Sequence, residues 1–593
     1  MKSSKEGTFI KGKDASLEES IEKMYAKLSL HYIDIDEVSM LNPVPFVYSQ
    51  YIRDASCELM FTNGKGASTK ACLASALGEY FERLSCNYFF ADYYLGEQIV
   101  SGDFVHYPNE KWFSFSEEDE KIPQGLLSDE LWAYFDPQNE LQPYQLIDIN
   151  VGVDERGICA LPFTRISDRQ SIYFPVNIIG NIFVSNGMAA GNTESEAQVQ
   201  ALCEVYERYA KNKIIAEGIC LPIIPDVVMD RFPEVQASVE KLEAYGYHLR
   251  ICDASLGGVY PVISVTLIHP KDGSVFASFG GHPCFEVALE RTLTELLQGR
   301  SLDMLDDLSV PSFNQDEVAN PHNLETHFIN ATGLLSYEFF KETSDYSFVD
   351  WNYEGSTKNE LEEMSKIARE QGFDIYIADY AHLGVYACRI LIPGMSDIYP
   401  VGDLLWSNNN EGAYFREALL GLDKLKDEEM IEVLESLEDG EYNDMIKVAE
   451  FIGVVPDENT PWASLQVGEL KAMLYLALGE LESAEEWVTW CCYMAVLDDK
   501  RAKLYNCIHA ILVVQLEQKD LAQFKHSFVQ MYGQECVKES EEVVAGKLRF
   551  HGLHRTSMAL EGFEKHLTLL QGYEKVQKAK KDFCEPLIKR DKS

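Results

Sequence analysis

Ten residues of this chain occur twice in similar form. SALGEYFERL fills residues 75–84, and QALCEVYERY fills residues 200–209. Each copy places two glutamates three residues apart and follows them with an arginine: Glu79, Glu82 and Arg83 in the first, Glu204, Glu207 and Arg208 in the second. Carboxylates at this spacing share one face of a helix, and the arginine can flank them. Four carboxylates gathered in this way are more acid than a protein interior accepts without cations.

Both copies predict helices that are apolar outside a narrow polar stripe, the first over 68–90 and the second over 194–217. A helix that is apolar nearly all round is buried. An isolated Glu-x-x-Glu-Arg is ordinarily a solvated helix face, but the apolar flanks and the duplication favour a buried site. Buried carboxylates are paired, protonated or bound to metal. Oxygen ligands with no His or Cys nearby favour Mg²⁺, ahead of Ca²⁺ or Mn²⁺.

A third segment, VALERTLTELLQGR at 287–300, places Arg291, Glu295 and Gln298 on one helical face. By itself it is an ordinary amphipathic helix, but beside the other two it predicts a third wall of one site. Carboxylate cages hold Mg²⁺ best when a polyphosphate supplies further oxygens. Arg208, Arg291 and Lys13 are then the expected partners of the phosphates.

Glycine-rich stretches precede the glutamate helices: GKGAS at 64–68 and GMAAGNT at 187–193. Such starts let backbone N–H groups approach a phosphate. Neither matches G-x-x-x-x-G-K-[ST], so they do not predict a P-loop, and FGGHP at 279–283 lacks the Rossmann glycine spacing. Thr193 and Glu196 fit a capping box, which is a purely structural alternative for Glu196.

Composition excludes several classes of protein. The chain has 593 residues, too many for one core, and predicts two to four domains. Its formal net charge of −45 argues against non-specific nucleic-acid binding, although it is equally explained by solubility alone. The 14 cysteines include no C-x-x-C pair, which favours a reducing cytoplasm. The first residues lack an apolar signal core, and no run is long enough to predict a membrane span.

The chain divides into a mixed α+β region over 1–405 and an all-α region over 406–593. Strand-like stretches fall at 57–62, 158–166, 171–183, 249–254, 259–268, 274–280, 373–380 and 384–393. Helix-like stretches fall at 17–29, 68–90, 194–217, 234–245, 285–300 and 357–370. In the second region, the ALGELESAEEW stretch at 477–487 is a tetratricopeptide-like cue and predicts a protein-binding helical repeat. A plain helical bundle that covers the first region is the alternative.

These segments resemble the YcaO superfamily over residues 9–405. The strings that carry the resemblance include FIKGKDASLEESI, FTNGKGASTKACLASALGEYFERLSCNYFFADYYLGE, NIIGNIFVSNGMAAGNTESEAQVQALCEVYERY and FASFGGHPCFEVALERTLTELLQGR. The resemblance implies an enzyme that uses ATP and Mg²⁺ without a P-loop. It implies metal-binding roles for Glu79, Glu82, Glu204, Glu207 and Glu295. It implies positions near ATP for Lys13, Ser20, Asn192, Glu196, Arg208 and Arg291. Ala189 departs from a serine expected near the nucleotide.

The resemblance further implies that ATP activates an amide oxygen by phosphorylation. The helical C-terminal region matches the branch of the superfamily that is accessory to β-methylthiolation of a ribosomal small-subunit protein. Expected partners are therefore a peptide or protein substrate, a radical methylthiotransferase, and a second copy of the chain bound through the C-terminal helices. No direct nucleic-acid or membrane partner is expected.

Three alternatives stay open. The chain ends in CEPLIKRDKS and lacks the proline-rich tail of the azoline-forming branch, so peptide cyclodehydration is the less favoured activity. A non-enzymatic assembly factor would use ATP only as a structural ligand. A metal-dependent hydrolase would use the carboxylates without ATP. No Ser–His–Asp or Cys–His pairing predicts a covalent nucleophile, so no residue is assigned a direct catalytic role.

Overall fold

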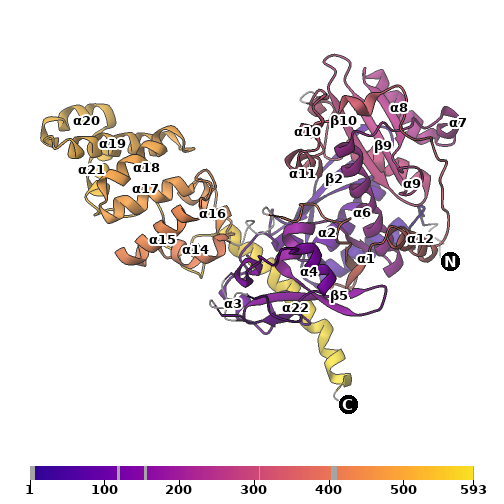
Figure 1. The fold of residues 1–593 in the computed structure, drawn as a ribbon, viewed down its shortest axis with the longest axis horizontal. Coiled ribbons are helices and arrows are strands. Elements are labelled where there is room, and N and C mark those ends of the chain that lie inside the picture. The colour runs from indigo at the N-terminus through magenta and orange to yellow at the C-terminus, as the bar shows by residue number, and fades with distance from the viewer. Residues whose placement is uncertain (1–6, 117–120, 153–155, 306–307, 403–410, 592–593) are drawn as a thin grey trace, which may run out of the picture.

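The computed structural model describes residues 7–116, 121–152, 156–305, 308–402 and 411–591. The predicted boundary between 405 and 406 lies outside the described residues. The α+β expectation is confirmed: sheets and helices form the first region, and the elements of the described part of the second region are helices (Figure 1).

The first region contains three antiparallel sheets. One joins β1 (Ile35–Val44), β2 (Val47–Asp54) and β3 (Phe61–Gly66) in sequence order. Another has the order β10 (Val275–Gly281), β9 (Val262–Ile268) and β8 (His248–Asp253). The largest has the order β4 (Lys111–Phe113), β5 (Ile158–Arg165), β11 (Tyr376–Tyr380), β12 (Tyr386–Leu391) and β7 (Met188–Gly191), with β6 (Ser171–Pro175) beside β5.

One helix follows directly on an edge strand of each sheet. α2 (Thr69–Ser85) follows β3, α6 (Glu194–Glu217) follows β7, and α9 (Phe285–Leu296) follows β10. Ser68 and Thr193 start the first two, because their side-chain oxygens accept backbone N–H groups that the first turn leaves unpaired. The three predicted walls are thus three strand–helix units, and their helices lie together at the centre of the region.

Other helices complete the first region. They are α1 (Leu17–Leu30), α3 (Glu97–Val100), α4 (Asp129–Phe135), α5 (Val176–Ile178), α7 (Asp226–Met229), α8 (Pro233–Ala244), α10 (Gln315–Val318), α11 (Pro321–Ile329) and α12 (Thr357–Glu370). α1 packs on α2 and α12 packs on α6, so each glutamate helix is covered by another helix.

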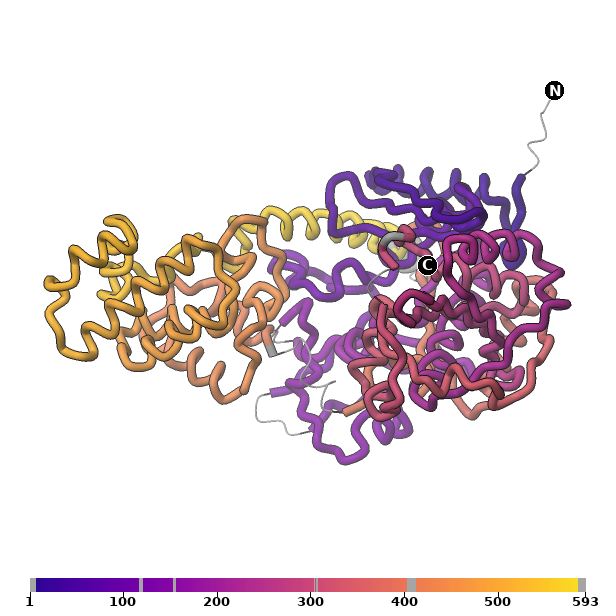
Figure 2. Tube along the Cα trace, turned by 90° about the horizontal axis from the view of Figure 1, so that it is seen from above, coloured from indigo at the N-terminus to yellow at the C-terminus, as the bar shows by residue number. Residues whose placement is uncertain are grey.

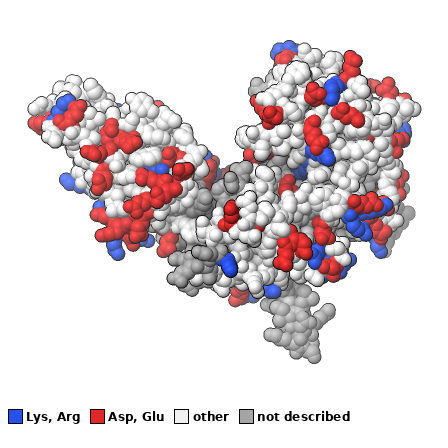
Figure 3. Space-filling view, viewed as in Figure 1, with Lys and Arg blue, Asp and Glu red and all other residues white. Residues whose placement is uncertain are grey.

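The second region is built from helices. They are α14 (Glu411–Leu420), α15 (Asp427–Asp439), α16 (Val448–Phe451), α17 (Val467–Leu478), α18 (Leu481–Tyr493), α19 (Asp499–Leu516), α20 (Lys525–Tyr532), α21 (Gln534–Val544) and α22 (Glu564–Asp591). α17 and α18 pack as a pair, separated where Gly479 adopts a positive φ of 76°. Acidic side chains gather over the lower part of this region, where α15 alone supplies seven Asp and Glu from DEEMIEVLESLED (Figure 3).

The last helix leaves the helical region and returns to the first one. α22, yellow in Figure 2, runs back alongside the segments that carry α2 and α3. The Tyr573 hydroxyl donates to the Val105 carbonyl at 2.7 Å, and the Lys580 ammonium donates to Asn87 Oδ1 at 2.6 Å. The ring of Tyr573 contacts the ring of Phe90 edge-on, with centroids 4.6 Å apart. One hydrophobic core therefore joins residues from both predicted regions.

Helix predictions match the structure more closely than strand predictions. α6 and α12 have the predicted bounds, and the tetratricopeptide-like stretch divides into two helices at Gly479. The strand expected over 171–183 ends at Pro175 and continues as helical turns, and β1 and β2 were missed. Among the helices of the described residues, none combines the length and the apolar character that crossing a membrane requires.

Candidate functional site

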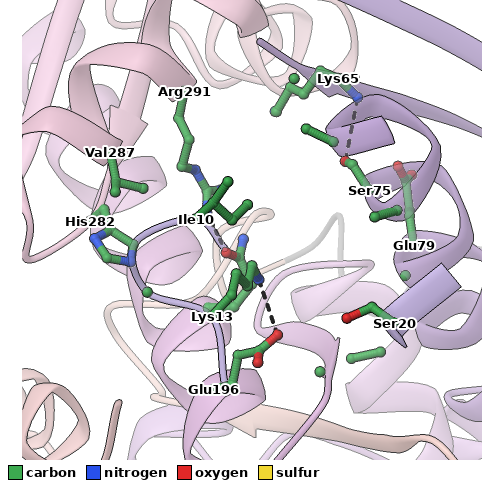
Figure 4. Close-up of a pocket in the computed structure, with 18 of the residues that line it drawn as sticks. Ile10, Lys13, Ser20, Lys65, Ser75, Glu79, Glu196, His282, Val287 and Arg291 are labelled. Carbon is green, nitrogen blue, oxygen red and sulfur yellow. Dashed lines mark hydrogen bonds and ion pairs between the residues drawn. The ribbon is translucent and has the colours of Figure 1, made fainter. Parts of the chain in front are cut away.

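A cavity of about 380 Å³ lies between α2, α6, α9 and the loop that precedes α1. All eleven predicted site residues line it: Lys13, Ser20, Glu79, Glu82, Asn192, Glu196, Glu204, Glu207, Arg208, Arg291 and Glu295. In Figure 4, Lys65, Ser75 and Glu79 face Lys13, Glu196 and Arg291 across the space. The fold therefore gathers side chains that are up to 282 positions apart in the sequence, from Lys13 to Glu295.

The duplicated motif makes the same internal ion pair in both helices. Arg83 Nη2 lies 3.3 Å from Glu79, and Arg208 Nη2 lies 2.6 Å from Glu204. Each guanidinium also stacks on an aromatic ring, Arg83 on Tyr88 at 4.4 Å and Arg208 on Phe328 at 4.9 Å. Stacking and pairing together fix the orientation of each arginine at the cavity wall.

The second glutamates of the two motifs differ in their surroundings. Glu207 accepts the backbone N–H of Gly281 at 2.9 Å, which anchors it to the end of β10. Glu82 has Arg83 Nε 3.6 Å away and is 9 % exposed. Burial, together with the charges of Glu204 and Glu79, raises the pKa of Glu82 well above its usual range, although Arg83 opposes the shift. Without a bound cation, the surroundings of Glu82 therefore favour its neutral form.

Lys65 is the main site residue that the sequence reasoning missed. It lies on β3, in the Gly64-Lys65-Gly66 turn sequence, and its ammonium forms an ion pair with Glu295. Burial lowers the pKa of Lys65 to about 8, and Arg291 adds to the shift, while Glu207, Glu79 and Glu204 oppose it. The available signal was a lysine in a glycine-rich stretch that leads into the first glutamate helix.

At the N-terminus of α6, one carboxylate organises the loop that precedes α1. Glu196 accepts from the Asp14 backbone N–H at 2.9 Å, from the Asn192 amide at 3.1 Å and from Lys13 at 3.3 Å. Ser20 joins the set by donating to Asn192 Oδ1 at 3.0 Å. Half of the predicted capping box is present, since the Thr193 hydroxyl accepts the Glu196 N–H. The Glu196 carboxylate does not complete the box, because it bonds instead to the residues named above.

Arg291 and His282 form the opposite wall. Arg291 donates to Gln200 and therefore links α9 to α6. Burial lowers the pKa of His282 to about 3, so this ring is neutral, and its Nδ1 accepts the Cys284 N–H at 3.0 Å. Gly12 adopts a φ of +73°, and a Cβ there would lie 2.6 Å from His282 Nε2. Ala189, which departs from the expected serine, lies in the hydrophobic core, while its neighbour Ala190 lines the cavity.

The site has unpaired hydrogen-bond donors and carboxylates that suit a metal–triphosphate ligand. The Nη1 atoms of Arg83 and Arg208 are buried and have no hydrogen-bond partner among the residues that the structure describes, so each can donate to a phosphate oxygen. Within the described ranges, no three His, Cys, Asp or Glu side chains converge closely enough to hold a metal ion alone. Mg²⁺ commonly takes only one or two carboxylates and completes its shell with phosphate oxygens and water. The donor set therefore fits Mg²⁺ bound together with a polyphosphate.

Comparison with known proteins gives matches to both regions. A family model described as YcaO cyclodehydratase, ATP- and Mg²⁺-binding, matches residues 63–396, and a YcaO cyclodehydratase C-terminal domain model matches residues 412–582. The chain is 52 % identical over 581 residues to the ribosomal protein S12 methylthiotransferase accessory factor YcaO of Escherichia coli, covering 97 % of this chain and 99 % of that protein. It is 53 % identical over 583 residues to an uncharacterised protein of Haemophilus influenzae, with the same coverage.

Solved structures of lower similarity include a YcaO from Methanopyrus kandleri bound with AMPPCP and Mg²⁺. It shares 17 % identity with this chain at a TM-score of 0.41, over 65 % of this chain and 94 % of that one. The two family models and the extended sequence identity lead to one conclusion: the chain belongs to the YcaO family, whose members bind ATP and Mg²⁺.

Proposed function

We propose that this chain uses ATP to activate an amide carbonyl by phosphorylation. A nucleophile adds to the carbonyl carbon, the resulting oxyanion takes the γ-phosphoryl group, and phosphate then leaves, so that each cycle converts ATP to ADP and phosphate. The observation that supports this best is the single cavity that gathers Glu79, Glu82, Glu204, Glu207 and Glu295 with Lys13, Arg208 and Arg291.

The residues have distinct roles in this proposal. The five glutamates would supply the carboxylates that hold Mg²⁺, and the ion would offset the charge that develops during transfer. The spare Nη1 donors of Arg83 and Arg208 orient the phosphates. Lys13, Ser20, Asn192 and Glu196 form a linked set that fixes the loop before α1 against the nucleotide. Arg291 positions the phosphates from the α9 side.

The proposed biological role is accessory to β-methylthiolation of a ribosomal small-subunit protein. The E. coli relative, whose sequence aligns along nearly the whole chain, has this function in its name. The ribosomal protein, the methylthiotransferase and a second copy of this chain, bound through the C-terminal helices, are the proposed partners. Sedimentation of the purified chain tests the last of these, and a monomer at micromolar concentration would refute it.

Glu204→Gln tests the site and the activity together. We expect Mg²⁺-dependent affinity for a non-hydrolysable ATP analogue, measured by calorimetry, to fall by at least a hundredfold, and ADP release to be lost. Glu217→Gln is the matched control, because Glu217 lies on the same helix with a side chain that is 58 % exposed. Unchanged affinity in Glu204→Gln would refute the site.

ADP release separates the enzyme from an assembly factor that only binds nucleotide. It is measured with the purified chain alone and with the S12 protein of the same organism added. ADP formation in step with modification of S12 supports the proposal. Tight nucleotide binding without turnover in either condition would favour the assembly factor, and hydrolysis of the protein without ATP would favour a metal-dependent hydrolase.

A further inference from the structure

A second cavity, of about 110 Å³, lies on the other side of the α2 C-terminus from the nucleotide site. Its wall is polar and deeply buried: Arg389, Asn177, Asn181 and His106 are each at most 6 % exposed. This cavity has no role in the proposed nucleotide chemistry. Burying polar groups is costly unless they bond to one another or to a ligand, so each group of this wall should have a partner.

Arg389 is the cation of this wall that lacks a countercharge. Its Nη2 donates to the carbonyls of Ile179 and Val184, while Nε is buried without a partner and Nη1 makes no hydrogen bond within the described part of the chain. Burial lowers the pKa of Arg389, in contrast to Arg83, whose neighbouring carboxylates raise it. The guanidinium thus keeps N–H groups on Nε and on Nη1 available, each of which can donate to a single carboxylate oxygen.

The carboxylates near the second cavity are engaged elsewhere or exposed. Asp148 accepts from His106 at 2.6 Å and from the Asn150 N–H at 2.8 Å, and Asp92 is exposed to solvent. Neither forms an ion pair with Arg389 within the described ranges. Lys580 lies behind the wall, where it donates to Asn87 Oδ1 and to the His106 carbonyl. Arg389 therefore remains the unmatched charge that faces this space.

Asn177 adds a hydrogen-bond acceptor to the wall of the second cavity. Asn177 uses its amide N–H groups on the carbonyls of Gln145 and Ile147, and its Oδ1 is buried without a donor. A ligand that suits this wall carries a carboxylate for Arg389 and an N–H for Asn177. The small volume excludes a large anion, and a single guanidinium without a second cation disfavours a doubly charged phosphate.

The second cavity adjoins the first through a thin wall. Glu82 lines the nucleotide cavity and Cys86 lines the second one, one helical turn, or about 6 Å, further along α2. Val385, directly before β12, lines the first cavity, and Arg389 on β12 lines the second, four residues or about 13 Å further on. Arg83, at the nucleotide, stacks on Tyr88, which lines the second cavity.

We propose that the second cavity binds the carboxylate of an acidic residue of the protein substrate, which anchors that substrate beside the nucleotide. An extended chain spans about 3.3 Å or slightly more per residue, so the activated amide lies within about four residues of the anchored carboxylate. This positioning role depends on the proposed function, whereas the binding of a carboxylate does not.

The test measures binding of N-acetyl-aspartate N-methylamide and of its asparagine analogue to the full chain, without nucleotide, by NMR titration. We expect the aspartate compound to bind at least tenfold more tightly, and acetate to compete with it. Arg389→Gln should abolish the preference, Arg389→Lys should retain part of it, and both should keep Mg²⁺-dependent nucleotide affinity, which also shows that they fold.

Equal binding of the two compounds, binding of neither, stronger competition by inorganic phosphate than by acetate, or a preference that survives Arg389→Gln would each overturn the proposal. The wild-type comparison needs no variant and decides the matter even if Arg389→Gln fails to fold. Because nucleotide is absent, a failure here leaves the proposed ATP chemistry standing, and a failure of ATP turnover leaves this result standing.

Discussion

Buried charges occur in both regions of the molecule, but they are satisfied to different degrees. In the helical region, Glu469 is 0 % exposed, and both of its oxygens are used: Arg501 donates to one and the Tyr505 hydroxyl donates to the other at 2.9 Å. Arg501 also donates to Ser464. In the proposed nucleotide cavity, burial raises the pKa of Glu82, and two arginines keep buried N–H groups without acceptors among the described residues.

The difference shows that burial alone does not identify a functional charge. A closed cluster such as that of Glu469 contributes to stability, because removal of one member leaves its partner uncompensated. An open cluster contributes little to the stability of the ligand-free fold and keeps its hydrogen-bonding capacity for a ligand. The predictions below test this distinction in each region.

The largest effect is expected at Glu82. Glu82→Gln replaces the protonated acid with a neutral side chain of the same shape, so the free energy of unfolding without ligand should stay within about 0.5 kcal/mol of wild type. Mg²⁺-dependent affinity for an ATP analogue should fall roughly a thousandfold, or about 4 kcal/mol, because the variant cannot lose a proton to bind metal. Chemical denaturation and calorimetry measure the two quantities. A large loss of stability would show that the cluster is structural.

Glu469→Gln should produce the opposite pattern. It leaves Arg501, whose side chain is only 12 % exposed, without this countercharge, which should lower the free energy of unfolding by about 3 kcal/mol. Nucleotide affinity should remain within twofold of wild type, since the cluster lies in the helical region. The same two measurements apply, and a weakened nucleotide affinity at unchanged stability would contradict the comparison.

His566 links the two regions and predicts a pH dependence of stability. It lies on α22, its Nδ1 accepts the Val455 N–H at 2.9 Å, and its Nε2 lies 2.7 Å from the Tyr94 carbonyl. Burial lowers the pKa of His566 to about 4 from 6.5, so between these pH values the unfolded chain binds the proton more tightly.

This contribution is complete above pH 6.5 and is lost as the pH falls toward 4, by up to about 3 kcal/mol. Denaturation at several pH values in this window measures it. His566→Gln should have a flatter profile over the same window, and a variant profile as steep as that of wild type would assign the effect to other groups.

The smallest effect is expected at Lys13. Lys13→Met removes one cation from the open cluster, where the lysine side chain is 34 % exposed, and should weaken nucleotide affinity about tenfold, or about 1.4 kcal/mol. Lys11→Met is the matched control, because Lys11 lies in the same loop but is held by Glu286 and Glu354. It should change the affinity less than twofold. Equal losses in both variants would indicate a general effect of charge.

Much of the fold could be predicted, because helical signals are local. Thr193, the apolar spacing and Gly218 define α6, and Gly479 divides α17 from α18. The strands β1 and β2 were missed because their sequences carry little strand signal. Most residues of β1 are exposed, and buried and exposed positions alternate only weakly along β2, so the pairing of the two strands depends on tertiary contacts. The return of α22 to the first region rests on contacts such as that of Tyr573 with Val105, which no local pattern records.

The sequence by itself determined which residue types form the site, because a repeated Glu-x-x-Glu-Arg on an apolar helix has few uses other than binding cations. It also determined that each motif would pair its arginine with its first glutamate, since side chains four apart on a helix meet. Only the tertiary structure decided that Lys65 joins the carboxylates, that Glu82 is buried enough to hold a proton, and that Arg389 faces a second cavity without a countercharge. Burial and long-range contact set the charge state of these groups, and both arise when separate elements meet in space.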